Sequence, residues 1–285
     1  MAGDRDALYH QRDMALLTQH GKEQVIAPAL ERAGRRKVLR VAGYNTDLLG
    51  TLTREIPRAG TQLEAARKKA HIGMELAGLP LGVASEGASG PDPVVGIMPW
   101  NGELVTFMDD ELGIEVSGTT QGPAVFPHQL VADWASAQCF ARQSEFSDHD
   151  LVIRPEKEDD PRIRKGICSW PDLEAAFAWA LQQSGNGHVF LETDERAHAN
   201  PTRMRMIAAA AEDLARRLTS CGPECGAPGF GAVEQVAGLR CEWCGLPARE
   251  KAAKVLDCPR CSHRHTRPRR DRTHADPRCC DYSNP

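Results

Sequence analysis

The sequence predicts an α/β fold, in which helices flank a mixed sheet, followed by a small cysteine-rich module. Two observations support this prediction. Over residues 1–219, short apolar segments typical of strands alternate with segments whose apolar residues recur at helical spacing. Eight of the ten cysteines lie in residues 221–285. We therefore predict an α/β domain over residues 1–219, which could divide into two lobes near residue 125, and a separate module over residues 220–285.

Strands and helices alternate at the start of the chain. The expected strands cover residues 13–19, 38–41 and 79–84. One helix should follow the first strand and end at Gly34, and another should cover residues 61–76 and end at Gly78, because glycine is common just after a helix C-terminus. The third strand is expected to run into a glycine-rich turn over residues 85–90.

The alternation continues up to the cysteine-rich module. Two strands, over residues 103–108 and 113–118, are expected to pair with each other. The remaining elements are expected in the order helix, strand, helix, strand and helix, over residues 127–140, 150–154, 172–183, 188–192 and 201–218. Pro171 and Pro201 support two of the helix starts, because the fixed φ of proline suits the first helical turn.

The composition is that of a globular protein and excludes a membrane-spanning chain. Charged residues make up 26% and apolar residues 41% of the sequence. No apolar run approaches the roughly 18 residues that a membrane helix needs, and the polar N-terminal residues do not resemble a signal peptide. We expect a cytoplasmic protein without a membrane partner. The net charge is −4, but residues 221–285 carry 11 Lys/Arg against 8 Asp/Glu, so a basic surface is expected there.

Paired cysteines define the C-terminal module. The four pairs are Cys221/Cys225, Cys241/Cys244, Cys258/Cys261 and Cys279/Cys280. In a reducing compartment, clustered thiols favour a metal over disulfides, and two CxxC turns can direct four thiolates at one tetrahedral zinc ion. We predict two structural zinc ions in a module similar to a zinc ribbon; a redox pair or idle thiols are the alternative.

The spacing leaves the partition of the zinc ligands open. The simplest partition assigns the first two pairs to one ion: Cys221, Cys225, Cys241 and Cys244. The second ion would then have Cys258, Cys261 and Cys280, with a fourth ligand from Cys279, His263, His265 or His274. An interleaved pairing fits the spacings equally well.

Arginines are concentrated between the third and fourth cysteine pairs, at residues 260–270. Because arginines on a zinc ribbon can bind phosphates, this basic C-terminal loop could contact nucleic acid. The alternative is a solvated basic loop without a partner.

Four residues in the first part of the chain have side chains suited to phosphate chemistry. Glu86, in the expected glycine-rich turn, could hold Mg²⁺ or act as a general base. Lys22, at a strand-to-helix turn, could bind an anion together with helix N–H groups. Arg58, in the charged group at residues 54–58, and Lys69, on the second helix, could line the same phosphate pocket. Each could equally be a solvated surface charge.

The densest group of functional side chains lies at residues 192–205. Glu192 and Asp194 alternate at the end of a strand, so both carboxylates can face one side. Arg196 and Arg203 follow them. Two carboxylates with convergent arginines suit a site that binds Mg²⁺ and phosphate together. A structural ion-pair network at a helix N-terminus is the alternative.

Five stretches and the cysteine pairs carry a family resemblance. The stretches are Thr-Gln-His-Gly-Lys-Glu at 18–23, Thr46-Asp47 with Gly50-Thr51, Arg-Glu-Ile-Pro-Arg at 54–58, Ala-Ser-Glu-Gly at 84–87, and residues 192–204. In these the chain resembles a bacterial family defined only as a domain of unknown function. That family ends in a CxxC followed by Asn-Pro, whereas Ser283 takes the second position here. Either Cys279 substitutes for the missing cysteine or the last metal site is weaker.

The layout of the first ninety residues is similar to that of the inosine/xanthosine triphosphate pyrophosphatases. In those enzymes a turn with Thr, Asn and Lys binds phosphate, and a later strand ends in acidic residues that hold magnesium. In this chain Thr18 and Lys22 correspond to the phosphate-binding turn, and residues 85–87 correspond to the acidic strand end. Residues 65–70 and Arg203 correspond to positions on two helices of those enzymes. His20 and Ala65 stand where those enzymes have asparagine. The resemblance implies a related fold and a reaction that releases phosphate or pyrophosphate.

Two functions of different classes follow. The first is a metal-dependent hydrolase of a phosphate-containing small molecule or nucleotide. Its metal or base residues would be Glu86, Glu192 and Asp194, and its phosphate-binding residues Lys22, Arg58, Lys69, Arg196 and Arg203. The second is a non-enzymatic adaptor that binds nucleic acid or protein through the zinc module. If Glu86 and Glu192 face one pocket with Lys22 and Arg203, the hydrolase is favoured. If they lie on separate faces and the arginines at residues 260–272 form one stripe, the adaptor is favoured.

Overall fold

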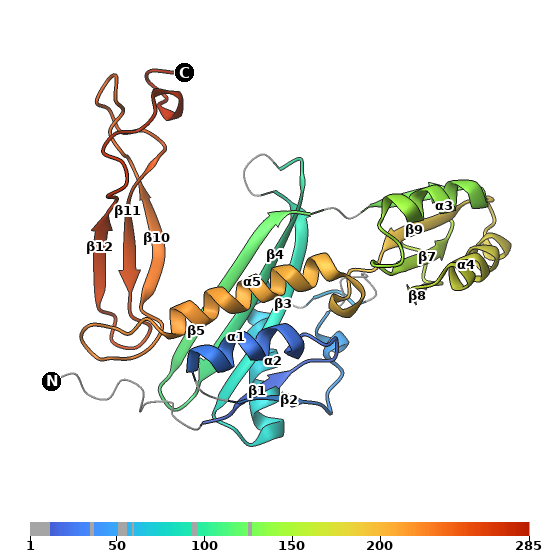
Figure 1. The fold of residues 1–285 in the computed structure, drawn as a ribbon, viewed down its shortest axis with the longest axis horizontal. Helices are drawn as coiled ribbons and strands as arrows, with labels where there is room; N and C mark the ends of the chain where they lie inside the picture. Colours follow the sequence, from blue (N-terminus) through green and yellow to red (C-terminus); the bar gives the residue numbers. More distant parts are fainter. Residues whose placement is uncertain are drawn as a thin grey trace.

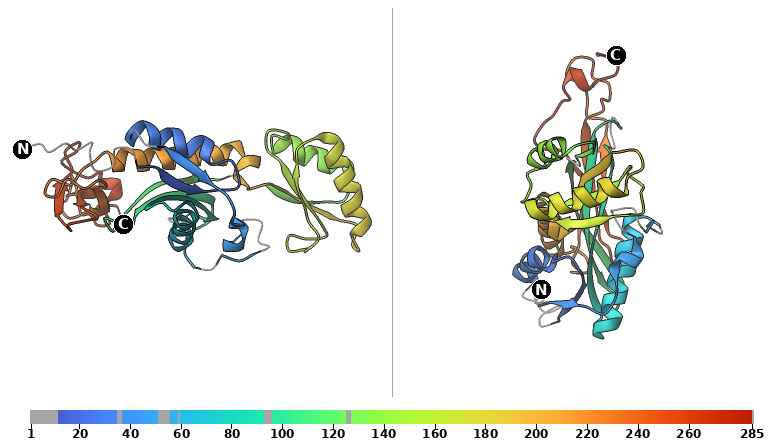
Figure 2. Two further views of the ribbon diagram at one scale, coloured as in Figure 1. Left: turned by 90° about the horizontal axis from the view of Figure 1, so that it is seen from below. Right: turned by 90° about the vertical axis from the view of Figure 1, so that its right-hand side faces the viewer.

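The computed structural model describes residues 12–34, 37–50, 56–58, 60–92, 96–124 and 127–284. These residues form three sheets that lie in a row (Figures 1 and 2). A five-stranded sheet is central, a four-stranded sheet lies at one end, and a three-stranded sheet carries the C-terminal part at the other. None of the helices in the described ranges combines the length and the apolar character needed to cross a membrane.

The central sheet is mixed, as the sequence predicted. Its strands are β1 (Met14–Leu17), β2 (Val38–Val41), β3 (Leu81–Pro91), β4 (Pro99–Asp109) and β5 (Ile114–Pro123), in the order β2-β1-β3-β4-β5. β1 runs parallel to both β2 and β3, whereas β3, β4 and β5 are antiparallel neighbours. A short 3₁₀ helix, η1 (Thr46–Leu49), follows β2.

Helices cover both faces of the central sheet. On one face lie α1 (Glu23–Gly34) and α5 (Pro201–Leu218), and on the other lies α2 (Gln62–Ala77). Because successive side chains of a strand point to opposite faces of the sheet, β1 contributes residues to the cores on both faces. Met14 and Leu16 belong to the core that includes α1 and α5, and Leu17 belongs to the core that includes α2.

The chain leaves the central sheet after β5 and builds a second lobe. This lobe contains β6 (His128–Val131), α3 (Trp134–Gln143), β7 (Leu151–Pro155), β8 (Arg164–Ile167), α4 (Trp170–Gln183) and β9 (Val189–Thr193). Its antiparallel sheet has the order β6-β9-β7-β8. A 3₁₀ turn, η2 (Ala197–Ala199), then leads back to α5, which Asn200 caps through its side chain.

The C-terminal part is an antiparallel three-stranded sheet. It consists of β10 (Gly231–Ala237), β11 (Lys251–Asp257) and β12 (Arg264–Pro268), followed by the turn η3 (Pro277–Cys279). Its first cysteine loop packs on the central core, since Ala227 and Cys258 belong to the same apolar cluster as α1 and α5.

The predicted fold class is confirmed, but two expectations within it are wrong. Residues 128–131 form a strand rather than the start of a helix, because they pair with β9, and the helix begins only after the cap Asp133. The expected glycine-rich turn at residues 85–90 is the middle of β3, because each of these residues pairs with β4. In both places pairing with a distant strand overrides the local preference.

We predict that Gly118→Ala in β5 destabilises the protein by about 1–3 kcal/mol. A Cβ at Gly118 would overlap the backbone of Leu214 and Ala210 on α5, so the helix would have to move away from the sheet. Denaturant unfolding measures the loss. The matched control is Gly122→Ala in the same strand, where a Cβ has no neighbour among the described residues within 4 Å. Equal stability of the two variants would contradict the close packing.

Candidate functional site

A cationic cleft opens where the short strand β1 ends and its neighbour β3 continues. β1 ends at Leu17 and pairs with β3 over two residues only, whereas β3 runs on to Pro91. The middle of β3 therefore borders the space beyond the end of β1. Ligands of α/β proteins usually bind at the carboxyl ends of parallel strands, where loops and helix N-termini converge.

Six cationic side chains from distant parts of the chain line this cleft: Lys22, Arg58, Lys69, Lys165, Arg196 and Arg203. Lys165 and Arg196 come from the second lobe and from the connection that follows it, and the others come from the central part. The cleft also contains two carboxylates, of Asp47 and Glu86, and the ring of His20. The excess of positive charge favours a polyanionic ligand.

Glu86 is held between cations. Lys69 Nζ pairs with one of its carboxylate oxygens, and Arg58 Nη2 lies 3.7 Å from the other. Burial opposes ionisation of this carboxyl, but the charges of Lys69, Lys22 and Arg58 hold the pKa of Glu86 below its usual value. Glu86 is therefore an anion at neutral pH and a weak base.

Lys22, shortly after β1, is a buried cation of the cleft. Its Nζ lies 3.4 Å from both the carbonyl oxygen and the hydroxyl of Ser85 and can donate to each. Burial, reinforced by the charges of Arg203 and Lys69, lowers the pKa of Lys22 to about 7. A polyanion in the cleft would favour the charged form and raise this pKa again.

His20 and Asp47 form a pair in the same cleft. His20 Nε2 lies 3.4 Å from Asp47 Oδ1, and the ring stacks on that of His198 with centroids 5.1 Å apart. Burial lowers the pKa of His20 and outweighs the opposing effect of Asp47. The imidazole is therefore largely neutral at pH 7 and can accept a proton.

Arg203 forms one wall of the cleft from the first turn of α5. Its Nε donates to Glu103 Oε1 at 2.6 Å, and its Nη1 donates to the backbone carbonyl of Glu195. Both side chains of the Arg203–Glu103 pair are almost fully buried. Only glycine fits at position 87, because a Cβ there would overlap the guanidinium and lie 2.7 Å from Glu103 Oε1.

Within the described ranges, Glu192 and Asp194 are not part of the cleft lining. Glu192 Oε1 lies 3.6 Å from Arg154 Nη2 inside the second lobe. Asp194 is fully buried and accepts hydrogen bonds from the backbone N–H of Gly166 at 3.1 Å and from Arg196 Nη2 at 2.6 Å. Asp194 therefore fixes the guanidinium of Arg196, which does line the cleft.

The structure also adds residues to the candidate site. His20 and Asp47 lie in stretches that carry the family resemblance but have no predicted role, and Lys165 reaches the cleft from β8. Their sequence signal is weak, since isolated polar residues in turns are common. The charged neighbours of Arg58 in the sequence, Arg54 and Glu55, lie outside the described residues.

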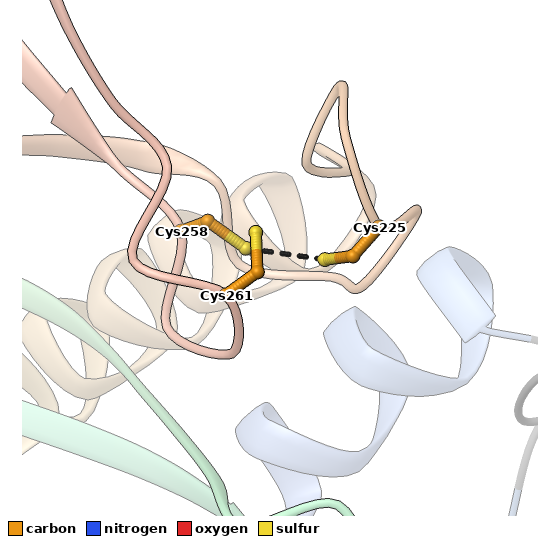
Figure 3. A group of neighbouring side chains, drawn as sticks. All are labelled: Cys225, Cys258 and Cys261. Atoms are coloured by element: carbon orange, nitrogen blue, oxygen red, sulfur yellow. Dashed lines mark hydrogen bonds between the residues drawn. The ribbon is translucent and has the colours of Figure 1, made fainter.

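Two groups of three cysteines could each hold a metal ion. The first contains Cys225, Cys258 and Cys261, and the second Cys241, Cys244 and Cys280. Within each group the sulfur atoms all lie within 4.8 Å of one another, close to the spacing of thiolates around one tetrahedral ion. Figure 3 shows that Cys258 and Cys261 point toward Cys225. The Sγ atom of Cys225 lies 3.5 Å from the Sγ atom of Cys258.

The simplest partition of the cysteines is therefore wrong, and the interleaved one is observed. The physical reason is the direction of the strands. The first and third pairs lie at one end of the three-stranded sheet, and the second pair lies beyond β10 at the other end. A strand of seven residues spans about 20 Å, far more than one ion can bridge. Consecutive pairs along the chain thus cannot share an ion.

The fourth position differs between the two cysteine groups. In the first group Cys221 is the candidate for the fourth ligand, because its sequence neighbour Gly222 packs against the sulfur of Cys258. In the second group the hydroxyl of Ser283 lies 3.4 Å from the sulfur of Cys241. A hydroxyl is a poorer ligand for zinc than a thiolate, so the second site is expected to be the weaker one.

The expected basic loop is largely an exposed strand. Arg264–Pro268 forms β12, and five cationic side chains line a groove along the sheet: Lys251, Lys254, Arg267, Arg269 and Arg270. The other arginines of this segment do not all join them: Arg264 pairs with Glu234, at 2.6 Å. The groove therefore gathers part of the predicted arginine stripe together with lysines from β11.

Residues 69–285 match a protein family described as a domain of unknown function (DUF6671), and this chain belongs to that family. No match was found among curated proteins or among solved structures. The predicted family resemblance is thus confirmed, and the similarity to the inosine/xanthosine triphosphate pyrophosphatases stays a prediction.

We predict that two double variants distinguish the interleaved partition from the sequential one. Cys225→Ser with Cys258→Ser damages one cysteine group, so the purified chain should retain one metal ion. Cys225→Ser with Cys241→Ser damages both groups, so it should retain none. Elemental analysis gives the count, and Cys139→Ser, outside both groups, should retain two. The reverse result for the two double variants would restore the sequential partition.

We predict a pH-dependent stability term from Lys22. Its pKa falls from 10.5 to about 7 on folding, so between these values the unfolded chain binds more protons than the native protein. The free energy of unfolding therefore rises with pH in this window, by at most about 1.4 kcal/mol per pH unit. Lys22→Met should remove this slope and be more stable than the wild type below pH 7.

Denaturant unfolding from pH 6 to 10.5 measures the Lys22 term as a difference from the wild type. Lys68→Met, at an exposed position on the neighbouring α2, is the matched control and should run parallel to the wild type. Parallel curves for Lys22→Met as well would show that Lys22 keeps its ordinary pKa.

Proposed function

We propose that this member of the DUF6671 family is a hydrolase that binds a phosphate-containing small molecule, such as a nucleotide, in the cationic cleft. The observation that carries the proposal is the convergence of six cationic side chains with two carboxylates in one cleft. Phosphoryl-transfer sites need this combination, because positive charge must stabilise the equatorial oxygens while a base or metal acts on the water.

The cations divide into two groups by their existing partners. Lys69 and Arg203 are neutralised by Glu86 and Glu103 and serve mainly to shape the cleft. Arg196 is oriented by Asp194 yet keeps its outer face toward the cleft, where a bidentate contact to phosphate is favourable. Binding of phosphate would also draw Lys22 into its charged form, which adds to the affinity.

Asp47 and Glu86, the carboxylates that line the cleft, are the residues that could hold a magnesium ion arriving with the substrate. Mg²⁺ is usually held by one or two carboxylates together with substrate phosphates and water. When bound, it would neutralise charge on the phosphate oxygens. Glu192 and Asp194, which the sequence suggested for this role, are not among the described residues that line the cleft. Asp194 holds Arg196, so we assign Asp194 a positioning role instead.

His20 is better suited than Glu86 to activate the water. A general base must be unprotonated, and its pKa should lie near the working pH. His20 meets both conditions, because it is a neutral imidazole oriented by Asp47. In the proposed reaction a water oxygen bonds to phosphorus, its proton passes to His20, and the bond to the leaving oxygen breaks. The cations of the cleft stabilise the negative charge that develops on that oxygen.

The two cysteine groups are proposed to hold structural zinc. Thiolate ligands in tetrahedral groups are typical of zinc, and the first group packs against the central core, where an ion would fasten the C-terminal sheet. A reducing cytoplasm, the location that we propose, would keep these thiols available for metal.

We predict Mg²⁺-dependent release of phosphate or pyrophosphate from at least one nucleoside triphosphate, in a panel that includes the inosine and xanthosine forms. His20→Gln should lower kcat by about 10²-fold or more with a small change in KM, because it removes the base but not the phosphate contacts. In the wild type the acid limb of kcat/KM against pH should lie below pH 6.5, since burial lowers the pKa of His20 in the free protein. That limb should disappear in His20→Gln.

Two further variants complete this test. Glu86→Gln should lower kcat/KM through loss of the metal and of the charge balance with Lys69. Arg264→Ala, on the C-terminal sheet and paired with Glu234, is the control and should keep full activity. A panel without turnover for the correctly folded wild type would remove the hydrolase proposal.

A second candidate function is nucleic-acid binding by the C-terminal sheet. The observation in its favour is the groove with Lys251, Lys254, Arg267, Arg269 and Arg270. Arg269 is already bound by Asp271 and Glu250, so the other four supply the free charge of the groove within the described ranges. Phosphate contacts of this kind depend little on sequence and strongly on salt.

We predict that the full chain binds a mixed-sequence oligonucleotide with an affinity that falls steeply as salt rises. Each phosphate contact adds about 0.9 to the slope of log K against log salt on duplex DNA. Arg267→Ala and Lys254→Ala should each reduce the slope by about 0.9, the contribution of one phosphate contact. Arg264→Ala, whose charge is paired, should change it less. A binding curve that is equal for all three variants would exclude the groove.

A further inference from the structure

A second cavity adjoins the cationic cleft on the other side of Arg203. It has a volume of about 210 Å³ and lies between the end of β5, the loop after α3 and the first turns of α5. Arg203 lines both cavities. Its guanidinium is fixed by Glu103 and by the carbonyl of Glu195, so the boundary between the two spaces is rigid.

Two buried hydroxyl groups in this cavity have no partner. The side chains of Ser144 and Thr193 belong to residues that are each only 5% exposed. Within the described ranges, neither Ser144 Oγ nor Thr193 Oγ1 has a hydrogen-bond partner, and both residues line the cavity. A buried polar group without a partner costs about 1–3 kcal/mol, so these two hydroxyls are placed to hydrogen-bond a polar molecule in the cavity.

The remaining lining suits a neutral polar group with apolar faces. Pro123, Pro127 and Met206 give apolar walls, and His149 adds an imidazole whose Nε2 is 3.1 Å from the hydroxyl of Thr202. Among the lining residues that the structure describes, the charged side chains are those of Arg203, which Glu103 neutralises, and Glu145, whose side chain is 74% exposed. The cavity thus lacks the excess of positive charge found in the cleft.

We infer that this cavity binds the uncharged heterocyclic part of the ligand whose phosphates occupy the cationic cleft. A heterocycle such as a nucleobase offers flat apolar faces to the prolines and edge donors and acceptors to Ser144 and Thr193. A purely apolar group would leave both hydroxyls unsatisfied, and a second anion would meet no free cation among the described lining residues. The inference rests on the proposed function and names its substrate class as a nucleotide, with Arg203 at the junction of base and phosphate.

The test compares ligands with and without a base. Binding of ATP, GTP, ITP, CTP and inorganic tripolyphosphate is measured by calorimetry without Mg²⁺, so that no turnover occurs. The wild type should bind at least one nucleotide about tenfold or more tightly than tripolyphosphate. Thr193→Val and Ser144→Ala should each weaken nucleotide binding about fivefold and leave tripolyphosphate binding unchanged. Arg58→Ala should weaken both kinds of ligand.

Folding and specificity controls accompany these variants. Because Thr193→Val and Ser144→Ala remove unsatisfied hydroxyls, both should unfold at the same or higher denaturant concentration than the wild type. Thr266→Val makes the same change on the exposed strand β12 and should alter no affinity. Equal binding of all nucleotides and tripolyphosphate would overturn the cavity inference but leave the cleft proposal standing. Absence of binding by every polyphosphate would overturn both.

Discussion

The buried Arg203 guanidinium ties together three parts of this structure. A charge of this kind is tolerated in the interior only when an opposite charge and hydrogen-bond acceptors surround it. Glu103 on β4 and the carbonyl of Glu195 meet that need, and Gly87 on β3 leaves room for the contact. The start of α5, the central sheet and the connection from the second lobe are thereby held in one arrangement, which sets the wall between the two cavities.

The electrostatics of the cleft follow from this arrangement. Several cations are brought together by packing, and the protein limits their repulsion by pairing some with carboxylates and by depressing the pKa of Lys22. The remaining excess of positive charge raises the electrostatic free energy of the protein, and an anionic ligand can lower it again. On this view the cleft is strained by charge rather than by backbone geometry, and ligand binding would stabilise the fold as well as fill the site.

The sequence was sufficient for the fold class and for most of the cations that line the cleft, but not for the roles of His20 and Asp47. Alternating apolar patterns predict the α/β architecture. Lys22 comes after β1, Glu86 lies in β3 and Arg203 lies in α5, and the type of each of these elements was correctly expected. Strand direction was not accessible in the same way, because it depends on pairing between distant segments. For that reason the metal ligands were partitioned incorrectly in the simplest scheme, and β3 was cut short at a turn. Unsatisfied hydroxyls such as that of Thr193 have no signature in a single sequence.

The chain enters and leaves the second lobe at neighbouring points. His128 in β6 stands opposite Glu192 in β9, and the N–H of Thr193 donates to the carbonyl of Pro127 at 3.3 Å. The lobe is thus closed at its base, like a cassette inserted between β5 and α5. It nevertheless contributes Lys165 to the cleft and Thr193 to the adjoining cavity. Exchange of this cassette during evolution would alter what the protein recognises while the packing of the central sheet stayed the same.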